Sequence, residues 1–279
     1  MCHNQQLPAS LHSGGASDEE ESDSSSEERE PPYTPDELAH VVLEFYKFLT
    51  ALHIDETALK IPPPGGWPGL TPESCGHHKS DYAIGVLRLL PYIEEDRGFH
   101  LHYKSYPIDY SVYKAADFER LQPCGEDIEF WTEEGEIADP ADVVCLALGR
   151  ESYGRTLFLN VRDGEITEDM VRAQTLSQVD VQYYFETLEK AYRTLRLIPC
   201  QGRVTIEAWD VAEATDEITE EQVCAQADEW LTDLDVQYLR QLYRRHGWPD
   251  SFRGADALNA VHELIKATGP RRGTWESWP

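Results

Sequence analysis

Two apolar runs in the middle of the chain, separated by a short Gly-containing segment, constrain the fold more than any other feature. Residues 142–149 read DVVCLALG, residues 155–161 read RTLFLNV, and the turn sequence RDG follows at 162–164. Short apolar runs bounded by Gly turns are typical of adjacent antiparallel strands. The sequence therefore predicts hairpin-connected strands with turns at 150–154 and 162–164. The alternating stretch GFHLHYKSYPI, at 98–108, predicts a further strand.

Apolar residues at helical spacing precede these strands. Residues 33–52 open with a capping box of Thr34 and Glu37 and continue as an amphipathic stripe, which predicts a helix. A Pro- and Gly-rich connection follows. A second helix is then expected to start at Thr71 and to end at Pro91, because proline cannot continue a helix.

Helical spacing returns after the strands. The stretch SQVDVQYYFETLEKAYRTLRLIP predicts a helix that ends at Pro199. Two later segments are also helical: one opens with a capping box of Thr219 and Gln222, and ADALNAVHELIKATGP supplies another. Helices, strands and helices in this order predict an α+β fold with an antiparallel sheet flanked by helices. The pattern does not reveal whether the last helices pack on the sheet or stand alone.

The first 32 residues differ in composition from the rest. They are poor in apolar residues, and DEEESDSSSEERE contains eight acids and one Arg. Such a segment cannot bury enough apolar surface to offset the entropy of ordering, so residues 1–32 are predicted to be a disordered acidic tail. Residues 33–200 are then the α+β domain, and residues 201–279 a mainly helical C-terminal region. Serines in the acidic run are candidate phosphorylation sites: Ser22, Ser24, Ser25 and Ser26.

Acidic charge is the strongest compositional signal. The formal net charge is -28, and removal of the acidic run, which carries -7, still leaves -21. Nucleic acids and anionic membranes bind through Lys and Arg, so this charge argues against both as partners. The acidity serves either solubility or a basic protein partner, and composition does not decide between them.

The sequence also bears on location and chemistry. No run approaches the 18 or so apolar residues of a membrane helix, and the N-terminus has no signal-peptide pattern, so we expect a soluble protein of the cytoplasm or the nucleus. Six scattered Cys without a CxxC pair fit free thiols in a reducing compartment.

Catalytic motifs are missing from the sequence. GRESYGRT, at 149–156, resembles a phosphate-binding loop with Arg155 in the Lys position, but a β pattern follows where that loop needs a helix. There is no GxSxG, HExxH, kinase or GxGxxG motif. We therefore expect no cofactor, and the sequence favours a non-enzymatic protein over an enzyme without deciding the matter.

Aromatic and His side chains make up the candidate binding surface. The CGHH segment follows the first Gly-Trp-Pro triplet, and FHLHY would place two histidines on one face of a strand. A zinc site needs three or four converging ligands, and two His pairs give no sign that they meet, so no metal is assigned. The tyrosines that follow could line a pocket or pack in the core. The candidate residues are Trp67, His77, His78, His100, His102, Tyr103, Tyr106 and Tyr110.

The Gly-Trp-Pro triplet occurs twice, at 66–68 and at 247–249. The second copy follows a basic helix end, where Gly247 can adopt the left-handed cap conformation and Pro249 blocks continuation. The first lies in a Pro-stiffened connection, where Trp67 is expected to attach the loop to the core. The flanking residues share nothing further, so two anchored turns are expected rather than a duplicated module.

Two resemblances follow from these segments. PPPGGWPGLTPESCGHHKSDYAIGVLRLLPYI and LRQLYRRHGWPDSFRGADAL resemble an uncharacterised family of ascomycete fungal proteins, which implies at most an accessory role beside secondary-metabolite gene clusters. DVVCLALGRESYGRTLFLNVRDGEI, followed by a helix, is similar to the central hairpin of SMI1/KNR4-type (SUKH) domains, which are mainly protein-binding modules. The resemblance to SUKH domains implies a protein partner and a regulatory role. The alternative is an accessory protein or unrecognised enzyme of fungal secondary metabolism with a His-lined pocket.

Overall fold

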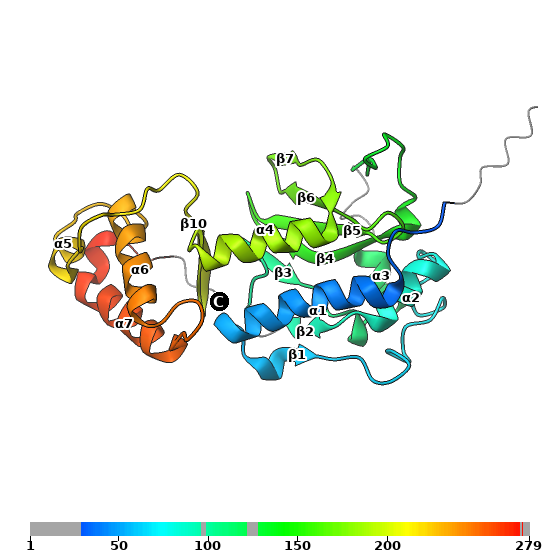
Figure 1. Ribbon diagram of the computed structural model, residues 1–279, viewed down its shortest axis with the longest axis horizontal. Helices are drawn as coiled ribbons and strands as arrows, with labels where there is room; N and C mark the ends of the chain where they lie inside the picture. Colours follow the sequence, from blue (N-terminus) through cyan, green and yellow to red (C-terminus); the bar gives the residue numbers. More distant parts are fainter. Residues whose placement is uncertain (1–28, 96–98, 122–127, 274, 276–279) are drawn as a thin grey trace, which may run out of the picture. The chain divides into compact units, whose positions relative to one another are not determined.

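The computed structural model describes residues 29–95, 99–121, 128–273 and 275, and residues 31–279 form one compact unit. Helices and antiparallel strands confirm the α+β fold class (Figure 1). Most of the predicted tail, with its four candidate phosphorylation serines, lies outside the described residues. No helix in the described ranges is both long and apolar enough to cross a bilayer.

The central sheet contains the hairpins that the sequence predicts. Its strands are β3 (Ser105–Pro107), β4 (Val143–Gly149), β5 (Arg155–Asn160), β6 (Glu165–Met170), β7 (Gln174–Thr175) and β8 (Val179–Asp180). The order is β3-β4-β5-β6-β7, β8 pairs with the start of β6, and every pairing is antiparallel. Gly149 and Gly154 meet at the first turn, where a Cβ on Gly149 would lie 2.7 Å from the carbonyl carbon of Gly154.

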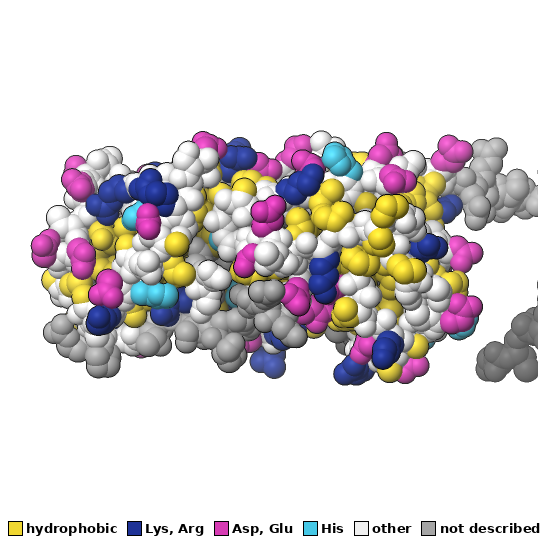
Figure 2. All heavy atoms as spheres, turned by 90° about the horizontal axis from the view of Figure 1, so that it is seen from below, with side chains coloured by type: hydrophobic (Ala, Val, Ile, Leu, Met, Phe, Trp, Pro, Cys, Tyr) yellow, Lys and Arg dark blue, Asp and Glu magenta, His cyan; other side chains and the backbone are white. Residues whose placement is uncertain are grey.

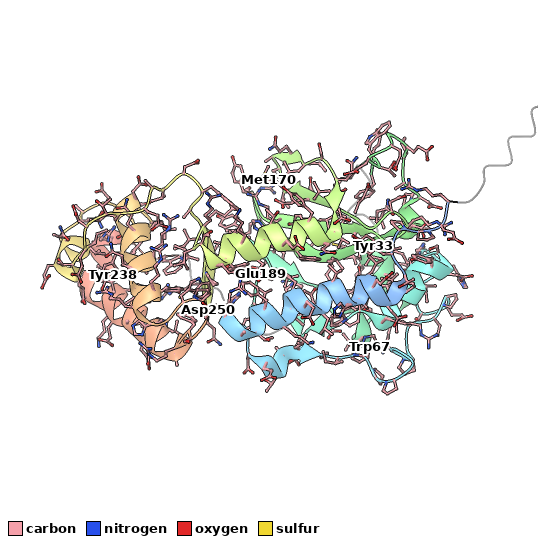
Figure 3. The ribbon with its side chains drawn as sticks, viewed as in Figure 1. Tyr33, Trp67, Met170, Glu189, Tyr238 and Asp250 are labelled. Carbon is pink, nitrogen blue, oxygen red and sulfur yellow. The ribbon has the colours of Figure 1, made fainter. Side chains whose placement is uncertain are left out.

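Two long helices pack together beside this sheet (Figure 1). Helix α1 (Pro35–Leu52) begins with the predicted capping box, and α4 (Val181–Arg193) starts at an Asp180 N-cap. Their apolar faces meet through Phe45 and Phe185, whose ring centroids are 4.7 Å apart. The hydroxyl of Tyr33, labelled in Figure 3, donates to Asp180 over 2.6 Å and so joins the N-terminal ends of the two helices.

Shorter elements complete the α+β part. They are the 3-10 turns η1 (Glu56–Ala58), η3 (Tyr110–Val112) and η5 (Pro140–Asp142), the strand pair β1 (Leu59–Lys60) and β2 (Tyr92–Ile93), and the helices α2 (Asp81–Leu89) and α3 (Ala115–Leu121). The predicted helix start at Thr71 is wrong. Gly76 and His77 have φ values of 63° and 58°, which break a right-handed helix, so residues 71–78 form turns and α2 starts after its Ser80 N-cap.

Two further expectations need correction. Among the described residues 99–108 of that stretch, only Ser105–Pro107 form a strand, because the chain turns at Lys104, whose φ is 48°. The third predicted helix ends at Arg193 and not at Pro199, because Leu195 adopts a φ of 56° and reverses the chain. Residues Leu197–Cys200 then form strand β9, which pairs with β10 (Arg203–Glu207).

The C-terminal region consists of α5 (Glu220–Cys224), α6 (Asp233–Arg245), α7 (Gly254–Thr268) and the 3-10 turn η6 (Gly269–Arg272). The predicted capping box of Thr219 and Gln222 starts α5. Buried Arg240 of α6 donates to the carbonyls of Leu195, Ala208 and Val211 at 3.0, 2.8 and 2.7 Å. The region therefore packs on the α+β part, and a boundary at residue 200 would divide the β9-β10 hairpin.

Candidate binding surface

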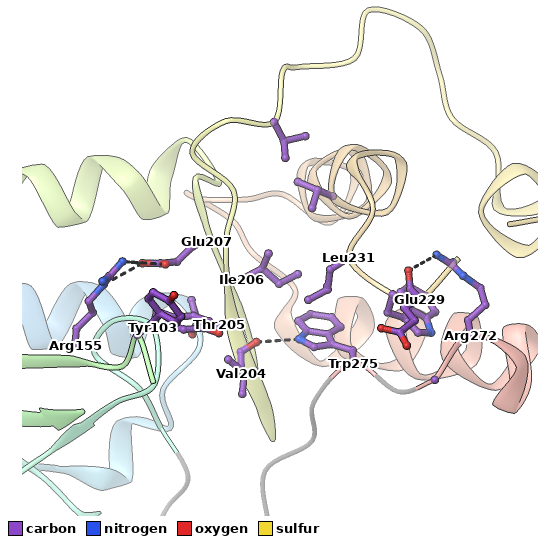
Figure 4. A pocket seen from close by; sticks show the side chains of 15 residues that line it. Tyr103, Arg155, Val204, Thr205, Ile206, Glu207, Glu229, Leu231, Arg272 and Trp275 are labelled. Carbon is purple, nitrogen blue, oxygen red and sulfur yellow. Dashed lines mark hydrogen bonds and ion pairs between the residues drawn. The ribbon is translucent and has the colours of Figure 1, made fainter. Parts of the chain in front are cut away.

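A groove of about 660 Å³ runs along the edge of β10 (Figure 4). It is lined by four consecutive residues, Val204 to Glu207, and Glu207 points toward Arg155 whereas Ile206 points toward Leu231. Successive side chains of a strand point to opposite faces, so a groove that touches all four follows the strand's edge. Within the described ranges β10 pairs only with β9, which leaves this edge without a partner strand.

The two walls of this groove come from different parts of the chain. Tyr103, Tyr153 and Arg155 belong to the α+β part, and the other wall comes from the C-terminal region. In the latter, Trp275 is 1% exposed and its Nε1 donates to the carbonyl of Val204 over 2.9 Å. One backbone acceptor at the start of β10 is therefore already in use.

A network of buried ion pairs lies beside β10 and includes two residues that line the groove, Arg155 and Glu207. Arg155, which is 9% exposed, donates through Nη2 to both carboxylate oxygens of Glu207 at 2.8 and 3.0 Å, and its Nε lies 3.2 Å from Glu168. Tyr184 donates to Glu168 over 2.8 Å, and burial raises the pKa of that carboxyl. The Arg155 guanidinium is thus engaged by two carboxylates, and the GRESYGRT segment is a turn between strands β4 and β5 with no helix after it.

His102 is neutral in this network. Its Nδ1 accepts the backbone N–H of Tyr103 over 2.6 Å, so that nitrogen carries a lone pair. Burial, together with the nearby Arg155, lowers the pKa of His102 to about 4 despite Glu207, whose carboxylate is 3.6 Å away. The contact between His102 and Glu207 is therefore not an ion pair at neutral pH.

Two more grooves adjoin the first. One of about 340 Å³ shares Arg155 and Glu207 with it, and one of about 780 Å³ shares Val211. Trp209 lines both of the additional grooves and is 44% exposed. We call the three grooves together the Trp209 surface. Five of the nine large hydrophobic side chains that are exposed in the described ranges line it: Tyr153, Leu176, Tyr183, Trp209 and Leu231.

The exposed charges of the Trp209 surface are mainly acidic. The guanidinium groups of Arg155, Arg240 and Arg272 are buried and bonded within the protein. Among the described side chains, the exposed charged residues that line the grooves are four acids and two bases: Glu186, Asp210, Glu213, Glu229, Lys190 and Arg196. By contrast, the face in Figure 2 carries acidic, basic and hydrophobic side chains interspersed.

The structure separates the eight residues proposed from the sequence. Trp67 is half-buried in the Pro-rich connection (Figure 3), and its Nε1 donates to the carbonyl of Leu90 over 2.9 Å, as expected for a loop anchor. His77 is exposed and His78 half-buried in the turn at 71–78. Only Tyr103 and His102 line the Trp209 surface.

The remaining three residues are core residues rather than surface residues. His100, Tyr106 and Tyr110 are 3%, 4% and 2% exposed, and burial lowers the pKa of His100 to about 4. In the described ranges no three His, Cys, Asp or Glu side chains are grouped so that they could hold a metal ion. The histidines thus lie in different surroundings: His102 lines one groove of the Trp209 surface, His78 lines a separate pocket beside Lys79, and the two do not share a cleft.

Sequence reasoning missed Trp209, Leu231 and the role of Arg155. The sequence did contain a signal for Trp209. This tryptophan lies in the polar stretch EAWDVAEATDE, outside any periodic apolar pattern that would place it in the core. Arg155 offered a similar signal as a lone charge at the start of an apolar strand. Neither residue could be placed at a common surface without the fold.

Comparison with known proteins adds no relative to this description. No protein-family model matches the chain, and no curated protein or solved structure is significantly similar to it. The resemblances to a fungal family and to SUKH domains therefore stay predictions.

Proposed function

We propose that this chain is a non-enzymatic protein-binding module that holds an extended segment of a partner protein along the free edge of β10. The observation that carries the proposal is the position of the groove, which follows an unpaired strand edge and leads into the exposed apolar groups of the Trp209 surface. Strand addition of this kind supplies affinity through main-chain hydrogen bonds and specificity through pockets for alternate side chains. A binding role is also what the resemblance to SUKH domains implies.

The chemistry of the surface defines the partner segment. Trp209, Tyr153 and Leu231 offer contacts for apolar side chains. The acidic groups around them, on a chain of net charge -28, favour Lys or Arg beside those apolar residues. Long-range attraction would also speed the encounter with a basic partner. The four described cysteines are free thiols, which supports a cytoplasmic or nuclear setting for this binding.

Selection of peptides tests this function. Random dodecapeptides displayed against the immobilised full chain should yield sequences with alternating apolar residues and flanking Lys or Arg. Each selected peptide is then remade with single N-methyl groups along its backbone. In an added strand, only every second residue donates its N–H to β10. N-methylation of these residues should weaken binding about tenfold, and N-methylation of the residues between them much less.

Matched tryptophan variants locate the binding. Trp209 and Trp131 are 44% and 46% exposed, but only Trp209 lines the grooves described above. Trp209→Ala should weaken binding of the selected peptides about tenfold, and Trp131→Ala should leave it unchanged. The proposal would be overturned if no peptide is selected. It would also be overturned if the affinity of the selected peptides depends neither on which residues are N-methylated nor on the presence of Trp209.

A further inference from the structure

A separate pocket, of about 240 Å³, lies between the sheet and α3. Its walls are aromatic: Tyr110 stacks on Phe118 with ring centroids 5.3 Å apart, and Phe130 meets Phe158 edge-on at 5.0 Å. None of its described lining residues belongs to the Trp209 surface. The volume equals that of about eight water molecules, which suits a single ring or a short chain.

One cationic side chain lies in this apolar wall. Lys79 donates through Nζ to the carbonyls of Pro140 and Val143 at 3.0 and 2.5 Å, and both acceptor residues also line the pocket. An ammonium group has three donors, so one remains for another acceptor. No carboxylate of the described ranges forms an ion pair with Lys79 within 4 Å. Burial lowers the pKa of the Lys79 ammonium, and the opposing charges of Asp142 and Asp139 offset this effect only in part.

We infer that this pocket binds a small amphiphilic carboxylate, with its apolar part among the aromatic rings and its carboxylate on the Lys79 ammonium. Two features of the pocket point to this class of ligand. The rings gain from burying an apolar body, and Lys79 gains from a charge-assisted hydrogen bond that replaces lost hydration. A neutral ligand of the same shape would offer the third donor of Lys79 at most an uncharged acceptor, and a cationic ligand would be repelled.

A series of three ligands on the unaltered full chain tests the inference. Hexanoate, hexanol and hexylammonium have the same apolar chain and differ in charge, and titration calorimetry with each measures the dissociation constant. Hexanoate should bind at least tenfold more tightly than hexanol, and hexylammonium should bind more weakly than either. Equal affinity for all three, or no binding of hexanoate, would overturn the inference.

Lysine variants assign the preference to one side chain. Lys79→Met should remove the preference for hexanoate over hexanol, so that the ratio of their dissociation constants approaches one. Lys47→Met is the control, because Lys47 is 54% exposed on α1 and pairs with Glu44; it should leave the ratio unchanged. If folded Lys79→Met protein still binds hexanoate more tightly than hexanol by the same factor, the role of Lys79 is refuted. If circular dichroism shows that Lys79→Met does not fold, the ligand series alone decides.

Discussion

The ion pair between Arg272 and Asp235 holds the C-terminal region together and allows a matched test of burial. Arg272 donates through Nη1 and Nη2 to the two carboxylate oxygens of Asp235 at 2.9 and 2.7 Å, and the two side chains are 1% and 0% exposed. Arg244 and Glu213 form the same two-pronged pair at 2.7 and 2.8 Å, but these side chains are 45% and 55% exposed. The two pairs therefore share geometry and differ in burial.

Removal of the arginine should lower the free energy of unfolding by very different amounts in the buried pair and in the exposed pair. Arg272→Met leaves the Asp235 carboxylate buried, and breaking a buried pair typically costs about 3–5 kcal/mol. Three other donors still reach Asp235, from Gln226, Leu231 and Thr232 at 2.9, 2.9 and 3.0 Å. Arg272→Met also removes the donors to the carbonyls of Asp228, Val223 and Glu229, so we expect a loss within this range of about 3–5 kcal/mol. Arg244→Met leaves a carboxylate that water solvates, so its cost should be about 0–1 kcal/mol.

Urea unfolding of both variants, followed by far-ultraviolet circular dichroism at pH 7, measures the two free energies of unfolding. The slope against urea should stay unchanged, since neither substitution alters the surface that unfolding exposes. Equal losses in the two variants would refute the reasoning, because they would mean that burial does not set the cost of breaking the pair.

Two pH effects of opposite sign should also appear. The pKa of His102 is about 4 in the folded chain and 6.5 when unfolded, so its stabilising contribution is complete above pH 6.5 and is lost as the pH falls toward 4. His102→Gln should therefore lose less stability between pH 7 and pH 5 in urea unfolding, by about 2 kcal/mol; an unchanged pH dependence would contradict the neutral histidine. Burial raises the pKa of Glu165 from 4.5 to about 7, and its Oε2 is buried without a hydrogen-bond partner, so stability falls as the pH rises from 4.5 through 7. Glu165→Gln should be more stable than the unaltered chain at pH 8 and not at pH 4, as thermal melting would show; a gain at both values would point to another cause.

Local sequence signals predicted those parts of the fold that local physics decides. The capping box at Thr34 and the Gly turns between β4, β5 and β6 fix hydrogen bonds between residues a few positions apart. The wrong helix ends have a shared cause. Pro199 indicated a helix end and Thr71 a helix start. The chain instead reverses near them at Leu195 and His77, which adopt left-handed conformations, and a Leu or His in a sequence does not indicate such a conformation.

The candidate surface was harder to predict than the fold. Its exposed groups come from segments more than 70 residues apart, such as Tyr153 and Leu231, and no periodicity relates positions so far apart. The predicted histidines illustrate the same limit. An alternating pattern suggested that His100 and His102 share a strand face, whereas the chain turns beside them and buries both.

The two Gly-Trp-Pro triplets show what a short motif can specify. Gly66 and Gly247 have φ values of 82° and 89°, so each turns the chain in a way that other residues resist. The tryptophan that follows donates its indole N–H to a backbone carbonyl at the C-terminal end of a helix: Trp67 to Leu90 after α2 at 2.9 Å, and Trp248 to Tyr192 in α4 at 3.0 Å. Helix ends leave carbonyls without partners inside the helix. The Leu90 carbonyl fits this description, whereas the Tyr192 carbonyl also accepts the backbone N–H of Leu195 over 2.9 Å. In both places the triplet joins a left-handed Gly turn to an indole hydrogen bond at a helix end, so local backbone chemistry accounts for its repetition.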